Sequence, residues 1–369
     1  MSPPKDTGDA GGETADGGDA RASSDVATPD ASGNADTGAD VDAGNDGCPS
    51  DAGVPNELRC TGLYSDWASK TIAPGVMAYT PGLVFWSDGA VKSRWLYLPP
   101  GTQIDTTDMD NWVFPVGTKI WKQFVVGGQT IETRLLWKTD AYDWVYLDYR
   151  WSPDGTSTQR LDTGEKNVNG TTYEIPATNV CSQCHNGSPD TVLGIDFVGL
   201  ATSGVEGVTV ATLEAQNAFT KNPPSTTLAI PEDSTGKAAA ALGWLHVNCG
   251  IGCHNANPGA GASQTQLYLK LVAGEILMAD GGVGPVSGLD TYTRAVGVAA
   301  IEMPNGMPVE RIDPGHAGES LVSILAGTRC NDAGVGCIQM PPIVSHIPDD
   351  AGLALVNAWI NALPPVGDP

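Results

Sequence analysis

The pattern of apolar and polar residues divides the chain into three stretches. Residues 1–47 contain almost no large apolar side chain and consist mainly of Asp, Gly, Ala, Ser and Thr. Such a stretch cannot bury enough surface to offset the entropy lost on ordering, and its like charges extend it. We therefore predict a disordered acidic tether over residues 1–47, with a simple solubilising tail as the alternative.

Residues 48–178 have the composition of β-strands. Aromatic and β-branched residues are concentrated in four segments, and turns rich in Gly, Pro and Asp separate them: 95–101, 112–126, 129–138 and 143–151. Eight of the ten tryptophans lie in this stretch. Tryptophan in such density favours a packed core, and a binding face for a polymer is the alternative. We predict a Trp-rich antiparallel β-domain.

The remainder of the chain has helical patterns separated by long loops. Residues 237–248 predict one helix, and residues 349–363 predict a last helix whose apolar residues recur at steps of three and four. Asp349 or Asp350 can cap the start of that helix, and Pro364 ends it.

Two motifs in this helical part carry the candidate chemistry. Cys181-Ser-Gln-Cys184-His185 has two residues between its cysteines, and Cys249-Gly-Ile-Gly-Cys253-His254 has three. Covalent haem attachment requires two cysteines about one turn apart, followed by a histidine that binds the iron. A single motif of this kind also occurs in zinc and redox loops. Two of them together with a suitable methionine downstream indicate haem attachment. We predict two covalently bound haem c groups, with thioethers at Cys181, Cys184, Cys249 and Cys253 and iron ligands at His185 and His254.

Met340 is the candidate sixth ligand of the second haem. A Met-Pro-Pro loop precedes the last helix, and the fixed φ angles of Pro341 and Pro342 stiffen that loop. The alternative for Met340 is a place in the core. His/Met ligation gives a relatively high potential that suits electron transfer. The predicted fold is therefore α+β and multidomain, in four parts: a tether (1–47), the β-domain (48–178), a first haem segment (179–236) and a second haem domain (237–369).

The first haem has no obvious sixth ligand. His246 is one candidate, although it lies three residues before Cys249 on a predicted helix and could simply pack there. A residue from the far end of the chain is another: Met303, Met307, His316 or His346. The third alternative is an open iron, which would need an acid–base residue nearby, and Asp190 and Asp196 are the local candidates.

The sequence resembles the exported dihaem c-type cytochromes of Gram-negative bacteria over about residues 80–365. The resemblance is carried by segments 83–105 and 111–124 in the β-region, by CSQCHNGSPDTVLGIDF around the first motif, by LGWLHVNCGIGCHN and by the QMPP loop. It implies two haems and an exported location, without an established substrate. The three-residue spacer of the second motif departs from the commoner form.

Charge and the other cysteines limit the location and the partners. The formal charge is −24, from 43 acidic and 19 basic residues, which disfavours nucleic acid and anionic membranes as partners. The spacing of the four remaining cysteines suggests two short-loop disulfides, Cys48–Cys60 and Cys330–Cys337, as in oxidising compartments. No segment is apolar enough to span a membrane. We expect a periplasmic or cell-surface protein whose leader is not visible, with a lipid anchor as an option at the absent N-terminus.

Three functions follow from these observations. The first is electron transfer between redox protein partners. The second is a peroxidase-like haem enzyme with an open first haem. The third is a module that binds a partner or polymer through the Trp-rich β-domain. The shortage of acid–base residues around the first motif favours electron transfer.

Overall fold

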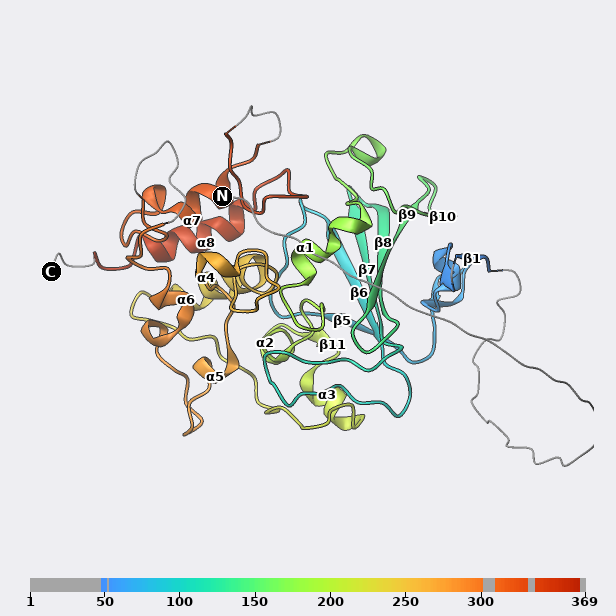
Figure 1. The fold of residues 1–369 in the computed structure, drawn as a ribbon, viewed down its shortest axis with the longest axis horizontal. Helices are drawn as coiled ribbons and strands as arrows, with labels where there is room; N and C mark the ends of the chain where they lie inside the picture. Colours follow the sequence, from blue (N-terminus) through green and yellow to red (C-terminus); the bar gives the residue numbers. More distant parts are fainter. Residues whose placement is uncertain (1–47, 52, 301–308, 331–335, 366–369) are drawn as a thin grey trace, which may run out of the picture. The chain divides into compact units, whose positions relative to one another are not determined.

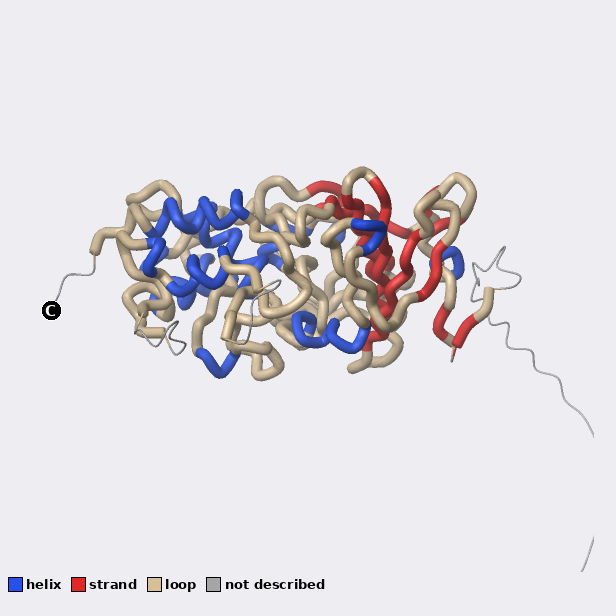
Figure 2. The backbone as a smooth tube through the Cα atoms, turned by 90° about the horizontal axis from the view of Figure 1, so that it is seen from above, coloured by secondary structure: helices blue, strands red, loops and turns tan. Residues whose placement is uncertain are grey.

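The computed structural model describes residues 48–51, 53–300, 309–330 and 336–365. The predicted tether and two of the candidate ligands, Met303 and Met307, lie outside these residues. The described residues all belong to one compact unit, Asp46–Pro369. Within it the strands gather at one end and most of the helices at the other (Figure 1, Figure 2).

A seven-stranded antiparallel sheet is the largest element, and it confirms the predicted antiparallel β-structure. Its order is β10 (Thr158–Arg160), β9 (Trp144–Trp151), β8 (Gln129–Lys138), β7 (Lys119–Val126), β6 (Val91–Tyr97), β5 (Val76–Thr80) and β11 (Glu206–Gly207). Two small hairpins precede it, β1 (Ser50–Asp51) with β2 (Val54–Pro55) and β3 (Tyr64–Asp66) with β4 (Thr71–Ile72). Because β11 lies beyond residue 178, the helical part of the chain contributes an edge strand to the sheet.

Short helices make up most of the regular structure after residue 178. They are α1 (Cys181–His185), α2 (Phe197–Ala201), α3 (Val210–Ala215), α4 (Ala238–Leu245), α5 (Ala273–Ile276), α6 (Asp290–Thr293), α7 (Leu321–Gly327) and α8 (Asp350–Ile360). The two predicted helices are present as α4 and α8. The side chain of Asp349 accepts a hydrogen bond from the Gly352 N–H at 3.0 Å and so caps α8. The helix predicted over 237–248 ends as an α-helix at Leu245, and residues 246–248 belong to a π-helical turn instead.

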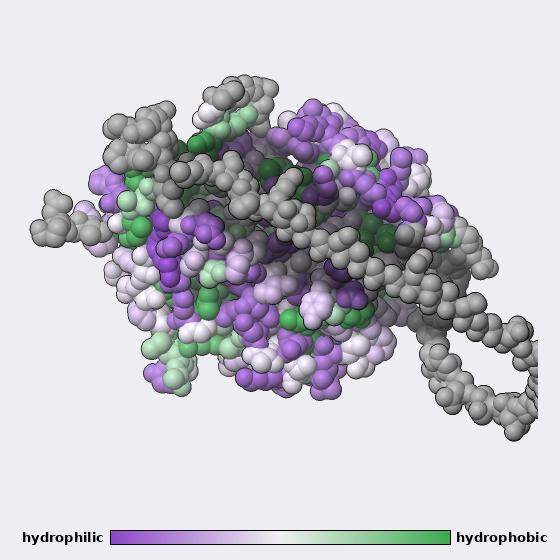
Figure 3. All heavy atoms as spheres, viewed as in Figure 1, coloured by the Kyte–Doolittle hydropathy of each residue, from purple (hydrophilic) through white to green (hydrophobic). Residues whose placement is uncertain are grey.

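One face of the sheet packs on the N-terminal segment. Trp121, Trp151 and Tyr149 are buried there against Leu58 and Leu63. None of the eight tryptophans of residues 48–178 is classed as exposed, since four are buried and four are half-buried. Core packing is therefore the main role of these side chains. Hydrophilic residues cover most of the surface in view, with small apolar patches between them (Figure 3).

The opposite face of the sheet packs on the rest of the chain. Leu96, Ile120 and Leu136 from the sheet share one continuous core with Leu245 of α4 and Trp359 of α8. This core continues from the β-region into the described helices without a break. Segments 48–178, 179–236 and 237–365 all contribute side chains to it.

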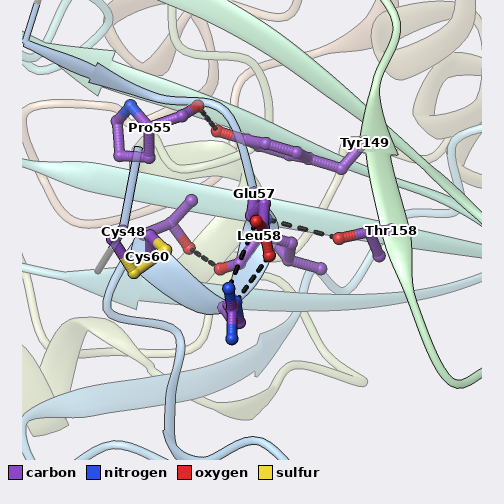
Figure 4. The surroundings of a disulfide bond; sticks show 9 residues. Cys48, Pro55, Glu57, Leu58, Cys60, Tyr149 and Thr158 are labelled. Atoms are coloured by element: carbon purple, nitrogen blue, oxygen red, sulfur yellow. Dashed lines mark hydrogen bonds and ion pairs between the residues drawn. A yellow bond between two sulfur atoms is a disulfide. The ribbon is translucent and has the colours of Figure 1, made fainter. Parts of the chain in front are cut away.

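Both predicted disulfides are present. Cys48 is bonded to Cys60, and Cys330 to Cys337. Around the first bond, the Tyr149 hydroxyl donates to the Pro55 carbonyl at 2.8 Å, which ties the N-terminal segment to β9 (Figure 4). Disulfides of this kind are typical of oxidising compartments.

Candidate haem site

The first motif forms the one-turn helix α1, which lies against the sheet. The ring of His185 contacts the ring of Tyr146 on β9, with centroids 5.4 Å apart. The Nδ1–H of His185 donates to the Thr191 carbonyl at 2.6 Å. This bond fixes the tautomer and leaves Nε2 without a proton and able to bind a metal, which is how iron-binding histidines are commonly oriented.

The electrostatic environment keeps His185 neutral. Burial first, and then the nearby charge of Lys122, lower the pKa of His185 to about 3. His185 is half-buried. The lowered pKa therefore results from the enclosing sheet and not from complete loss of contact with solvent. A neutral imidazole is the form that binds a metal.

The backbone of the second motif accommodates the three-residue spacer through a wider helical turn. Helix α4 runs into a π-helical turn, η4 (His246–Gly250), and the His254 N–H bonds the Cys249 carbonyl five residues earlier at 2.9 Å. In a motif with a two-residue spacer, His follows the first Cys by four residues, the step of an α-helix. The extra residue is absorbed by the wider π turn, a feature often found at functional sites.

The two motifs pack directly against each other. A Cβ placed on Gly187 would lie 2.2 Å from the carbonyl oxygen of Gly252, inside the spacer of the second motif. The Cys253 thiol lies 3.8 Å from the Gln183 carbonyl. Contact with Cys253 lowers the pKa of Cys184 to about 7 and contributes to the raised pKa of Cys253. Segments about seventy residues apart therefore meet, and glycine permits the approach.

A cavity of about 350 Å³ opens beside this contact. Its walls include cysteines of both motifs, Cys184, Cys249 and Cys253, together with His254 and Met340. The volume lies at the lower end of the usual range of ligand pockets, about 300–1,000 Å³. None of the four motif cysteines forms a disulfide. Unbonded thiols, a histidine and a thioether around one cavity fit a covalently attached haem.

The loop that carries Met340 is held by several bonds. The Met340 N–H donates to the Leu325 carbonyl at 2.9 Å. The Gln339 amide donates to the carbonyls of Pro341 and Ser345, at 2.8 and 2.9 Å. The Cys330 N–H donates to the Gln339 side chain at 2.7 Å, directly beside the disulfide. Met340 therefore reaches the same cavity as His254 from a restrained loop.

The sheet presents a charged cluster to the first motif. Arg134 on β8 binds the Glu132 carboxylate through two nitrogens, at 2.6 and 2.9 Å, and lies 3.3 Å from the Asp148 carboxylate on β9. Burial and the neighbouring Glu132 charge raise the pKa of Asp148 well above its usual value. Burial alone would raise the pKa of Glu132, but the Arg134 charge and hydrogen bonds lower it overall. The cluster therefore favours a proton on Asp148 over one on Glu132.

His246 occupies a different position from the cavity walls. It is 1% exposed, and its Nδ1 accepts the Leu271 N–H at 2.9 Å. The proton of the neutral ring is then on Nε2, which has no partner among the described residues. Ligation through Nε2 would require the loss of that proton.

The other candidates from the sequence have identifiable local roles. His316 is exposed and pairs with Asp313, while the His346 Nε2–H donates to Glu174 at 2.7 Å beside the cavity. Asp190 is bound by Lys138 at 2.6 Å and by the Trp144 indole at 2.9 Å. Asp196 caps α2 by accepting the Gly199 N–H at 2.7 Å. Both acids therefore serve the fold.

No family model, no curated protein and no solved structure matches the chain. Among the described residues, no three His, Cys, Asp or Glu side chains form a group that could hold a metal ion. A haem iron needs fewer ligands from the protein, because the macrocycle supplies most of them and the chain only the axial ones. Within the same described residues, no helix has the length and apolarity that a membrane span requires.

Sequence reasoning missed the part of the site that the sheet contributes. Lys122, Arg134 and Tyr146 alternate along their strands with tryptophan and other apolar residues. That alternation predicts a polar face toward solvent. The cations are brought together by the register of β6, β7 and β8, which the alternation alone does not reveal.

Proposed function

We propose that this chain is an exported dihaem c-type cytochrome that passes electrons between redox protein partners. The observation that carries the proposal is the direct contact of the two motifs through Gly187 and Gly252. Groups attached to touching segments are close enough for electron exchange within one molecule. The resemblance of segments 83–105 and 181–197 to that family supports the same reading.

The residues of the chain have separate roles in this proposal. Bound haem would supply one-electron exchange at iron. The four motif cysteines hold the groups covalently, and His185 and His254 provide a neutral nitrogen to each. Met340, on its restrained loop, provides a thioether to the second group and favours a relatively high potential.

The proposed location follows from covalent chemistry and charge. Both disulfides suit an oxidising compartment, and covalent attachment of haem takes place outside the cytoplasm. We place the protein in the periplasm or at the cell surface. Partners with basic or neutral surfaces suit a chain with a formal charge of −24.

The test begins with the mass of the protein purified from a host that matures c-type cytochromes. Two haems are expected in the wild type, and one in a Cys181→Ser/Cys184→Ser variant. The second motif should keep its group in that variant, with an unchanged low-spin signal. A wild-type mass without haem refutes the proposal.

A haem enzyme is the second candidate, and the Glu132–Asp148–Arg134 cluster favours it. A protonated buried carboxyl group close to the first motif could serve as a general acid if the first iron were open. Optical and EPR spectra distinguish the two functions. Two low-spin signals that carbon monoxide and peroxide leave unchanged support the carrier. A high-spin haem that binds these ligands, and whose peroxide reaction slows in Asp148→Asn, supports the enzyme.

A further inference from the structure

Three cations form a row across the middle of the sheet. Arg94 on β6 is paired with Lys122 on β7, and Lys122 is paired with Arg134 on β8. Residues directly opposite each other on neighbouring strands share a face. The same face carries Tyr146, since Leu136 lies opposite both Ile120 and Tyr146. The row therefore faces the first motif.

Only one member of the row has a counter-charge. Arg134 binds Glu132 and Asp148. Arg94 is 8% exposed and contacts the Phe85 ring, at 5.8 Å from its centroid. Within the described part of the chain, neither Arg94 nor Lys122 forms a hydrogen bond or an ion pair. A buried cation without a partner is unfavourable, and here it occurs in a chain with a formal charge of −24.

The acidic groups around the row are already used. Asp88 accepts backbone N–H groups from His346 and Ile347, at 2.7 and 3.4 Å. Glu174 is bound by His346, and the two acids of the cluster are bound by Arg134. Among the described residues, these acids therefore leave no counter-charge for Arg94 and Lys122.

The row is connected to the first motif through the face of the sheet that carries it. On that face, the ring centroid of Tyr146 lies 5.4 Å from that of His185. Arg134 also lines the cavity, to which the first motif contributes Cys184 and the second motif Cys249, Cys253 and His254. An anion bound between the row and α1 would therefore lie beside the first motif.

We propose that Arg94 and Lys122 bind the carboxylates of the first haem, so that the sheet positions this group and sets its charge environment. The proposal rests on the proposed function. A haem has two propionate side chains, and guanidinium and ammonium groups are their usual partners in proteins. Both cations act here as positioning residues.

The test measures the midpoint potential of each haem in Arg94→Gln and Lys122→Gln. The matched control is Lys119→Gln, because Lys119 lies on the same strand but on the opposite face, where it donates to the Thr61 carbonyl at 2.9 Å. Both test variants should keep two haems. Loss of a nearby cation disfavours the added electron, so one potential should fall. We expect a change of about tenfold in the ratio of reduced to oxidised haem, equivalent to about 59 mV for one electron.

The pH dependence gives a second signature. A carboxylate that has lost its partner takes up a proton more readily, so the altered potential should rise as the pH falls from 8 to 5. The potential of the second haem and both potentials of the control should stay unchanged. Unchanged potentials in both test variants, with two haems bound, overturn the inference.

Further variants complete the test. Lys122→Arg keeps the charge, so its haem potentials should equal those of the wild type. If Lys122→Arg instead converts one haem to high spin, Lys122 is an iron ligand and the inference is overturned. If the Gln variants do not fold, Arg94→Met and Lys122→Met serve instead, and potentials equal to those of the wild type, with two haems bound, overturn the inference. A wild type without haem would instead refute the proposed function.

Discussion

Replacing Gly187 by alanine tests the contact between the two motifs. The added Cβ would lie 2.2 Å from the Gly252 carbonyl oxygen and 2.5 Å from the Ile251 carbonyl oxygen. Both neighbours are backbone atoms, so no side-chain rotation relieves the clash. The loops must separate by about 1.2 Å before the closer pair reaches an ordinary contact of 3.4 Å.

The cost follows from packing rather than from backbone strain. The φ angle of Gly187 lies outside the left-handed region, so alanine can adopt the local conformation. Forcing one extra carbon into a close-packed site typically costs about 1–3 kcal/mol. We expect the free energy of unfolding of Gly187→Ala to fall within that range.

The assay is guanidinium unfolding followed by tryptophan fluorescence, with midpoints compared between variants. Gly274→Ala is the control, because a Cβ at Gly274 meets no atom within 4 Å. It should be neutral or stabilising by up to about 1 kcal/mol. Equal midpoints for Gly187→Ala and the wild type would refute the contact.

Three further perturbations test other parts of the site. Met340→Ala should lower the potential of the second haem and change its optical spectrum, whereas Met278→Ala, at a side chain 49% exposed, should change neither. Replacing Cys330 and Cys337 by serine should cost about 2.5 kcal/mol of unfolding free energy, because the bond closes a short loop, and reduction of the wild type should reproduce that loss. Asp148 has a raised pKa, so its native state holds a proton that the unfolded chain releases above about pH 4, and stability should fall as the pH rises toward the native pKa. Asp148→Asn should remove that fall in thermal melts between pH 4 and 8.

The sequence predicted those parts of the structure that depend on local signals. The strands over 119–126 and 129–138, the last helix with its Asp349 cap and the pairing of nearby cysteines all follow from residues close together in the chain. The haem motifs are local too. Their presence could be recognised without knowing where either segment lies in the fold.

The missed features depend on contacts between distant segments. Nothing near Gly187 indicates that it meets Gly252, and the π turn at His246–Gly250 depends on how Gly250 packs against the backbone of residues 269 and 270. The cation row needs the register of three strands, which a strand pattern alone does not give. The charged residues of β6 and β7 were therefore absent from the predicted site.

This difference changes the role of the β-region. A sheet that carried only apolar side chains on its two faces would be a scaffold alone. Here one face buries aromatic side chains against the N-terminal segment, while the other turns Arg94, Lys122 and the Glu132–Asp148–Arg134 cluster toward the first motif. Buried charges are unfavourable in a sheet that has only a structural task. The second motif has its own restrained methionine loop and needs no such support. It follows that the sheet is the counterpart of that loop, because it supplies to the first motif the environment that the helical part of the chain supplies to the second.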